Sequence, residues 1–168
     1  MVSKKSVQYI ELGYTTAEQY WREVAWPAYE RFKLAPSRQA AIEASMPAWH
    51  IHEWIWHEKN PGEDTHGNKK FRKFQKRILT DCPQLSWIRD VADASKHRGL
   101  GRQPLEIKRM SLRRRFSGAI SGAPIGALPI SGNGLGKLAI VLNGGSTHDL
   151  SDVLACVVGY WQGNWFAA

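Results

Sequence analysis

Cysteine is scarce in this chain, which has only Cys82 and Cys156 among its 168 residues. Two cysteines cannot form a disulfide framework and they match no zinc-binding spacing, so a disulfide-rich secreted domain is not expected. Long apolar runs are also missing, because none approaches the roughly 20 residues that a membrane span needs. The amino terminus carries charge but no apolar stretch of signal-peptide length. We therefore expect a cytoplasmic protein with no membrane partner.

The overall composition is that of an ordinary folded protein. Hydrophobic residues make up 43% of the chain and charged residues 23%, which excludes gross disorder and a coiled coil. The length suits one domain, residues 1–168, with a core large enough to need no disulfide or metal.

Helical periodicity covers most of the sequence. Apolar residues recur every three or four positions in five segments, which are 17–34, 38–58, 69–80, 83–97 and a last one from about 150 onward. Residues able to cap these helices precede them, namely Thr15 or Thr16, Ser37, Asn68, and Thr147 or Asp149. Two prolines lie inside the pattern: Pro27 is expected to kink or split the first helix, and Pro47 to divide the second.

The pattern changes after residue 103. Alternating apolar and charged residues predict a strand near 105–116 with a bulge, and a second strand at 137–143. Between them, residues 117–136 contain six glycines and form a long excursion. The predicted fold is mainly α: a helical bundle of about five helices with a β-hairpin inserted before the last helix. Residues 1–103 form the helical core, 104–146 the hairpin, and 147–168 the final helix.

Positive charge is concentrated in the middle of the chain. The formal net charge is +8, but residues 59–115 hold sixteen Lys and Arg against six acids, an excess of +10. Such a field attracts phosphate polymers or acidic proteins; a solvated surface with no partner is the alternative. The predicted nucleic-acid contacts are Lys69, Lys70, Arg72, Lys73, Lys76, Arg77, Arg109, Arg113, Arg114 and Arg115.

Two groups of polar residues repeat at helical spacing. His50, Glu53 and His57 fall on one helix face, and Asp90, Asp93 and His97 fall on one face of another helix. If the two helices pack together, the six groups could hold a metal or support acid–base chemistry. Alternatively, Asp93 and His97 are an i,i+4 pair on the helix surface, with His97 favourable near the helix C-terminus. His50 is then a buried histidine whose hydrogen bonds are satisfied within the core. His52 and Glu53 begin a zinc-protease pattern, but Trp56 stands where the second histidine is required.

The segment Ile88–Arg102, IRDVADASKHRGLGR, resembles the signature helix of HEPN domains. In that motif an arginine and a polar residue are followed by a histidine, which here are Arg89, Asp90 and His97. Seven residues separate Arg89 from His97, more than in the family, which turns the two about 80° apart on a helix. The resemblance implies a small helical bundle of a prokaryotic or phage system, with homodimers common in the family and no cofactor or metal required.

Three functions follow. The preferred hypothesis is a non-enzymatic module that binds RNA, DNA or an acidic protein through its basic residues. The resemblance implies an alternative, a metal-independent endoribonuclease in which His97 is the general acid or base, with Arg89, Asp93 and Lys96 around it. The third is a metal-binding bundle through the six polar groups of the two helices.

Overall fold

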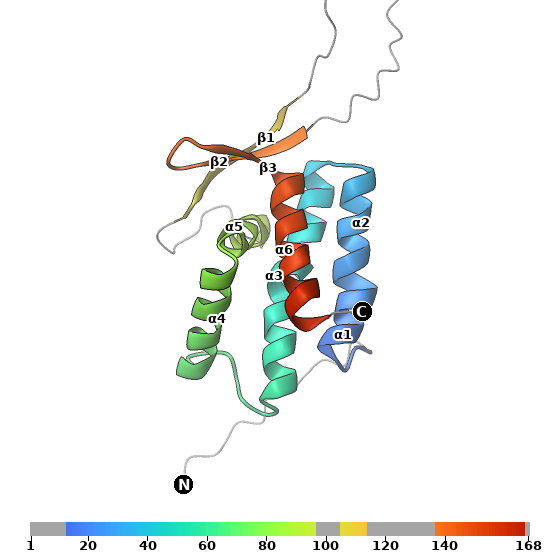
Figure 1. Cartoon of the computed structure of the whole chain (residues 1–168), viewed down its shortest axis with the longest axis vertical. Helices are drawn as coiled ribbons and strands as arrows, with labels where there is room; N and C mark the ends of the chain where they lie inside the picture. Colours follow the sequence, from blue (N-terminus) through green and yellow to red (C-terminus); the bar gives the residue numbers. More distant parts are fainter. Residues whose placement is uncertain (1–12, 97–104, 114–136, 167–168) are drawn as a thin grey trace, which may run out of the picture.

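Helices form the body of the molecule. The computed structural model describes residues 13–96, 105–113 and 137–166, with the side chains of Lys96, Leu112 and Arg113 left aside. In Figure 1 helices α2, α3, α4 and α6 run roughly alongside one another, α5 is seen nearly end-on, and a small sheet lies across one end. The predicted mainly helical fold with β structure inserted before the last helix is therefore confirmed. Residues 114–136, which include Arg114, Arg115 and the glycine-rich excursion, lie outside the described residues, as does His97.

The first helical segment changes type around its proline. It consists of α1 (Ala17–Tyr20), the π-helix η1 (Trp21–Ala25) and α2 (Trp26–Leu34). Proline has no N–H and its ring clashes with the carbonyl four residues earlier in an α-helix. The wide π turn lies just before Pro27, and the Trp26 N–H donates to the carbonyl of Trp21, five residues back. The break predicted at Pro27 therefore takes the form of a π turn.

Helix α3 (Arg38–Lys59) is the centre of the bundle and contacts α1, η1, α2, α5 and α6. The Ser37 side chain caps it by accepting from the Ala40 N–H, 3.0 Å away. The prediction that Pro47 divides this helix is wrong, because α3 is continuous. Pro47 removes one intrahelical hydrogen bond, whereas the helix buries residues on both sides of it, including Ala44, Ala48 and Ile51. That burial outweighs the local cost.

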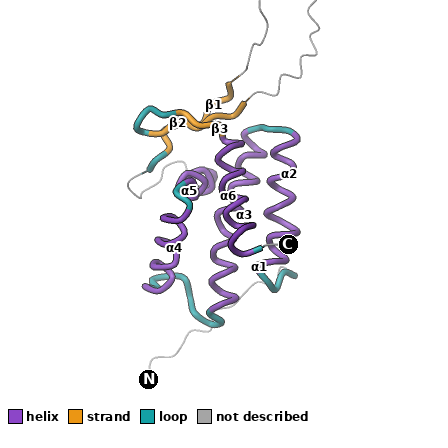
Figure 2. Tube along the Cα trace, in the orientation of Figure 1, coloured by secondary structure: helices purple, strands orange, loops and turns teal. Residues whose placement is uncertain are grey.

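Three further helices complete the bundle, and Figure 2 shows them beside α3. They are α4 (Lys69–Asp81), α5 (Gln84–Lys96) and α6 (Leu150–Trp165). Asn68 caps α4 and Asp149 caps α6, both through side-chain oxygens that accept backbone N–H groups, as predicted. Helix α6 is buried along one stripe, and the indole of Trp161 donates to the carbonyl of Ala48 at 2.8 Å.

The sheet is antiparallel with the order β1 (Ile107–Arg113), β2 (Lys137–Leu142) and β3 (Thr147–Asp149). The register shifts between Ile107 and Arg109, which confirms the predicted bulge. Leu138 and Ile140 of β2 are fully buried in the same core cluster as the helices. Strand β3 differs from the sequence prediction, which assigns Thr147 or Asp149 only as the cap of the last helix.

Candidate nucleic-acid interface

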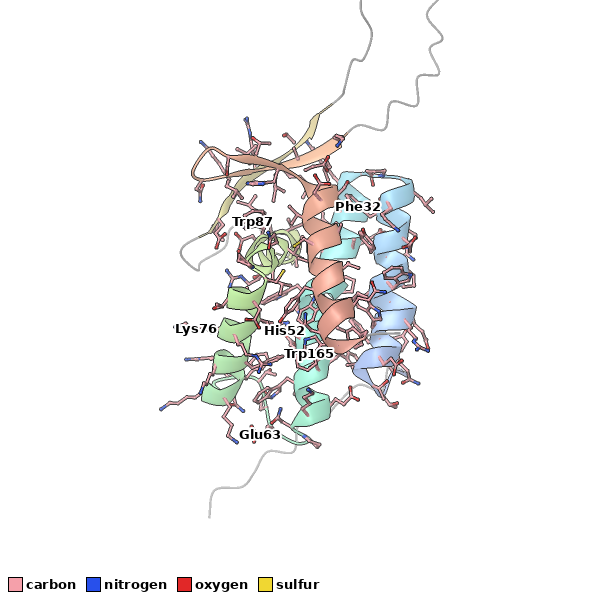
Figure 3. All side chains as sticks on the ribbon, in the orientation of Figure 1. Phe32, His52, Glu63, Lys76, Trp87 and Trp165 are labelled. Carbon is pink, nitrogen blue, oxygen red and sulfur yellow. The ribbon has the colours of Figure 1, made fainter. Side chains whose placement is uncertain are left out.

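Helix α4 carries the densest positive charge among the described elements. All six of its predicted contact residues are exposed: Lys69, Lys70, Arg72, Lys73, Lys76 and Arg77. Figure 3 shows Lys76 on the side of α4 that faces away from the bundle. At 100° per residue the six cations span an arc of about 160° and rise about 12 Å along the axis. They therefore form one continuous basic face, which we call the α4 basic face.

Few acids neutralise this face. Lys70 Nζ lies 2.9 Å from Glu63 Oε1 in the preceding loop, and the bond with Lys70 is the main cause of the lowered pKa of Glu63. In the part of the chain that the structure describes, no carboxylate is within ion-pair distance of Arg72, Lys73 or Lys76. The positive field of the α4 basic face is thus largely uncompensated.

Aromatic packing holds the opposite face of α4 against the bundle. Phe71 and Ile78 are buried. The Phe71 ring centroid lies 5.4 Å from that of Trp56 in α3, and the Phe74 centroid lies 6.1 Å from that of Trp165 in α6. The helix is therefore amphipathic, with an apolar stripe anchored in the core and a cationic stripe in water.

His52 is the polar part of this anchor. Its side chain is fully buried, stacks on Phe71 with centroids 5.5 Å apart, and is flanked by Trp49. Its Nδ1 lies against the carbonyl oxygen of Trp49, which requires an N–H there and leaves Nε2 to accept from the Gln75 amide at 2.9 Å. Burial lowers the pKa of His52 to about 4, against the raising effects of the Trp49 carbonyl and Glu53. His52 is therefore neutral and structural at pH 7.

The sequence contained a signal for this role. His52 lies on the same helical stripe as Trp49, Ile55 and Trp56. A histidine among such residues is expected to be a buried hydrogen-bonding group. The prediction from the zinc-protease pattern, which His52 and Glu53 begin and Trp56 breaks, does not include that role.

Strand β1 contributes fewer described cations than the α4 basic face does. Lys108 and Arg109 of β1 are exposed, but Arg114 and Arg115 lie outside the described residues and the Arg113 side chain is not described. Figure 1 shows the sheet across the end of the bundle beyond α5, whereas α4 runs along the side of the bundle, so the strand cations belong to a different part of the surface from the α4 basic face.

His50 and Glu53 meet, as their helical spacing predicts. His50 Nδ1 lies 3.4 Å from Glu53 Oε1. Burial acts to raise the pKa of Glu53, but the His50 contact and the nearby histidines, including His57, outweigh it and lower the pKa. Burial and the charge of Glu53 raise the pKa of Tyr20 to about 12. This cluster faces α1, through the stacked rings of Tyr20 and Trp54.

Asp90 has a structural contact of its own. It is 3% exposed, and its Oδ2 accepts the backbone N–H of Glu106 at 2.8 Å and of Ile107 at 3.3 Å. Arg89 Nε lies 3.9 Å from Asp90 Oδ1, and its guanidinium lies over the Trp49 ring. The Asp90 carboxylate therefore holds the start of β1 against α5, which is a structural role in the fold.

The remaining candidates do not complete a site within the described residues. Asp93 and His57 are half-buried, while His97 and the Lys96 side chain are not described. Among the described residues, no three His, Cys, Asp or Glu side chains are placed to hold a metal ion together. The structure thus joins His50 with Glu53 and Arg89 with Asp90.

Comparison with known proteins found no match to a protein-family model, a curated protein or a solved structure. Within the described ranges, every helix is too short or too polar to cross a membrane.

Proposed function

We propose that this protein is a non-enzymatic nucleic-acid-binding module that uses the α4 basic face on the phosphate backbone. The observation that carries the proposal is the set of six exposed cations on one 13-residue helix, with Glu63 pairing one of them. Phosphate polymers release counterions when lysine and arginine bind them, which supplies most of the affinity of non-specific binding. A rigid helix anchored by aromatic packing presents these charges in fixed positions.

The neutral side chains of α4 favour binding without sequence preference. Base edges are read by amide and hydroxyl side chains, and also by arginine and lysine at guanine. The Gln75 amide contacts His52, and the Thr80 hydroxyl donates to the carbonyl of Lys76 at 2.9 Å. Lysine and arginine remain, and the phosphate contacts that they make carry no sequence information.

The experiment is fluorescence anisotropy with two labelled duplexes of unrelated sequence and one single-stranded RNA, each titrated at several salt concentrations. The five cations of α4 other than Lys70 give an expected slope of log K against log salt of about −4.5 on duplex DNA. The two duplexes should bind within about threefold of each other. No binding at low salt would refute the proposal. Equal binding of poly-glutamate would identify an acidic protein as the better class of partner.

The endoribonuclease alternative depends on His97, which lies outside the described residues, so the HEPN resemblance stays a prediction. Incubation of purified protein with structured RNA and EDTA tests it directly. Cleavage that disappears in His97→Ala would show an enzyme and overturn the non-enzymatic assignment. Binding that survives in His97→Ala, without cleavage in either protein, supports the proposal.

A further inference from the structure

Two aromatic rings border the α4 basic face. On α4, Phe74 lies one helical turn from Lys70 and from Arg77. The Arg77 guanidinium carbon Cζ lies 5.6 Å from the centroid of the Phe74 ring. Phe74 is half-buried, and its ring stands at 89° to that of Trp165, which is also half-buried and ends α6. The basic face therefore ends, on this side, at a pair of partly exposed aromatic rings.

Trp165 also contacts a cation. The Nζ atom of Lys59, at the end of α3, lies 4.0 Å from the centroid of the Trp165 ring. Figure 3 shows Trp165 near the end of α6, on the side toward α4. Lys59 is exposed, so its flexible side chain is able to leave the ring for a phosphate group. Aromatic faces beside cations are the combination that proteins use to bind single-stranded nucleic acid.

A cleft opens beside Trp165 at the end of the bundle. Its volume is about 400 Å³, which is within the range of sites that hold small organic groups. Phe166 forms one wall and stacks on the buried Trp21, with ring centroids 5.0 Å apart. Glu58 forms another wall, where its Oε2 accepts the backbone N–H of Ala17 at 3.0 Å. Contacts within the protein therefore hold these walls in place.

The charges of the cleft indicate which part of a nucleotide enters it. The carboxylates of Glu18 and Glu58 line the cleft, so they repel a phosphate group from its interior. A nucleobase is uncharged and planar, and any base stacks on an indole ring. The phosphates then lie outside the cleft, on Lys59 and the α4 basic face, while a base stacks on Trp165.

We infer that Phe74 and Trp165 form a stacking platform for the bases of single-stranded nucleic acid, an inference that rests on the function proposed above and names the partner of the α4 basic face. A strand whose phosphates lie along Lys70, Lys73 and Arg77 brings its bases to the edge of the face that Phe74 occupies. The bases of a duplex are stacked on one another, so they offer no free face to the protein. A single strand therefore gains a contact that a duplex lacks.

The test compares two single strands of about 15 nucleotides with equal charge, oligodeoxythymidylate and an abasic strand with the same phosphates. Fluorescence anisotropy at several salt concentrations measures both affinities. The thymidine strand should bind about 5- to 100-fold more tightly, with the same salt slope, because stacking is added to equal phosphate contacts. Oligouridylate of the same length should bind within about threefold of oligodeoxythymidylate, because stacking does not involve the ribose 2′-hydroxyl.

Trp165→Ala should reduce the preference for the thymidine strand over the abasic strand to less than about twofold. Trp87→Ala is the matched control, because Trp87 is another half-buried tryptophan, packed against His148 at the sheet. It should keep the wild-type preference. A merely structural role of Trp165 would weaken the binding of both strands together and leave their ratio unchanged.

Equal affinities of the wild-type protein for the thymidine and abasic strands would overturn the inference and leave the proposed function standing. A wild-type preference in Trp165→Ala would also overturn it. No binding of either strand at low salt would refute the proposed function, and the inference with it. The comparison of the two strands uses the wild-type protein alone, so it does not depend on whether Trp165→Ala folds.

Discussion

The Nε2 atom of His52 on α3 lies 2.9 Å from the amide nitrogen of Gln75 on α4. This contact is a polar link between the central helix and the helix that carries the basic face. Because His52 is fully buried, its hydrogen bonds cannot be replaced by water without moving α4. The position of the cations therefore depends on a neutral imidazole in the core.

Stability should fall in acid because of His52. Its pKa is about 4 in the folded protein, against 6.5 for an unperturbed histidine, so the unfolded state binds the proton more readily. The free energy of unfolding should decrease as pH falls from about 6.5 toward 4, by roughly 3 kcal/mol in all. Urea titrations of wild type and His52→Leu across this range measure the effect.

The nearby groups that bear on this titration are Glu53, which favours the charged imidazole, and His50, which opposes it. His66→Asn, in an exposed loop, is the matched control and should keep the wild-type acid dependence. If His52→Leu shows the same pH slope as wild type, the proton uptake occurs elsewhere.

Gln75→Leu should weaken the attachment of α4. The substitution leaves the buried Nε2 of His52 without a donor, which costs about 1–3 kcal/mol. Urea unfolding at pH 7 measures this cost, and Gln162→Leu on the exposed side of α6 is the control. A Gln75→Leu protein as stable as the control would mean that the contact contributes nothing.

Asp90→Ala should release the start of β1. Two backbone N–H groups lose their acceptor, and we expect a loss of about 1–3 kcal/mol together with faster amide hydrogen exchange at Glu106 and Ile107. Asp90→Asn keeps one acceptor oxygen and should recover part of the protection, while Asp152→Asn on the surface of α6 should change neither readout. Unchanged exchange at Glu106 and Ile107 would show that Asp90 is not needed to fix the strand.

Local sequence rules predicted most of the helical fold. Ser37, Asn68 and Asp149 cap helices because their side chains need only the next few backbone N–H groups. The predicted division of the helix at Pro47 was wrong, because side-chain burial along the whole of α3 outweighs the local free-energy cost of the proline. Strand β3 was missed because three residues give no periodicity, and its pairing with β2 comes from the tertiary fold.

Fewer of the contacts in the candidate site than of the elements of the fold could be predicted from the sequence. Helical spacing correctly placed His50 beside Glu53, because both are on one helix. It could not show that Asp90 faces the start of β1, or that His52 meets Gln75, because those partners belong to other elements. Periodicity identifies the residues on a face, whereas only packing determines what the face contacts.

The most direct measurement compares the affinity of a labelled duplex of about 20 base pairs for two charge-reversed proteins at 50 and 200 mM salt. One combines Arg72→Glu, Lys73→Glu and Lys76→Glu on α4. The other combines Arg22→Glu on η1, Arg31→Glu on α2 and Arg38→Glu on α3. Both change the net charge equally. The account predicts that the α4 protein loses at least about 100-fold in affinity for the duplex and that its affinity depends less steeply on salt. The other charge-reversed protein should lose less than about tenfold in affinity. Equal losses in the two proteins, or wild-type affinity in the α4 protein, would contradict it.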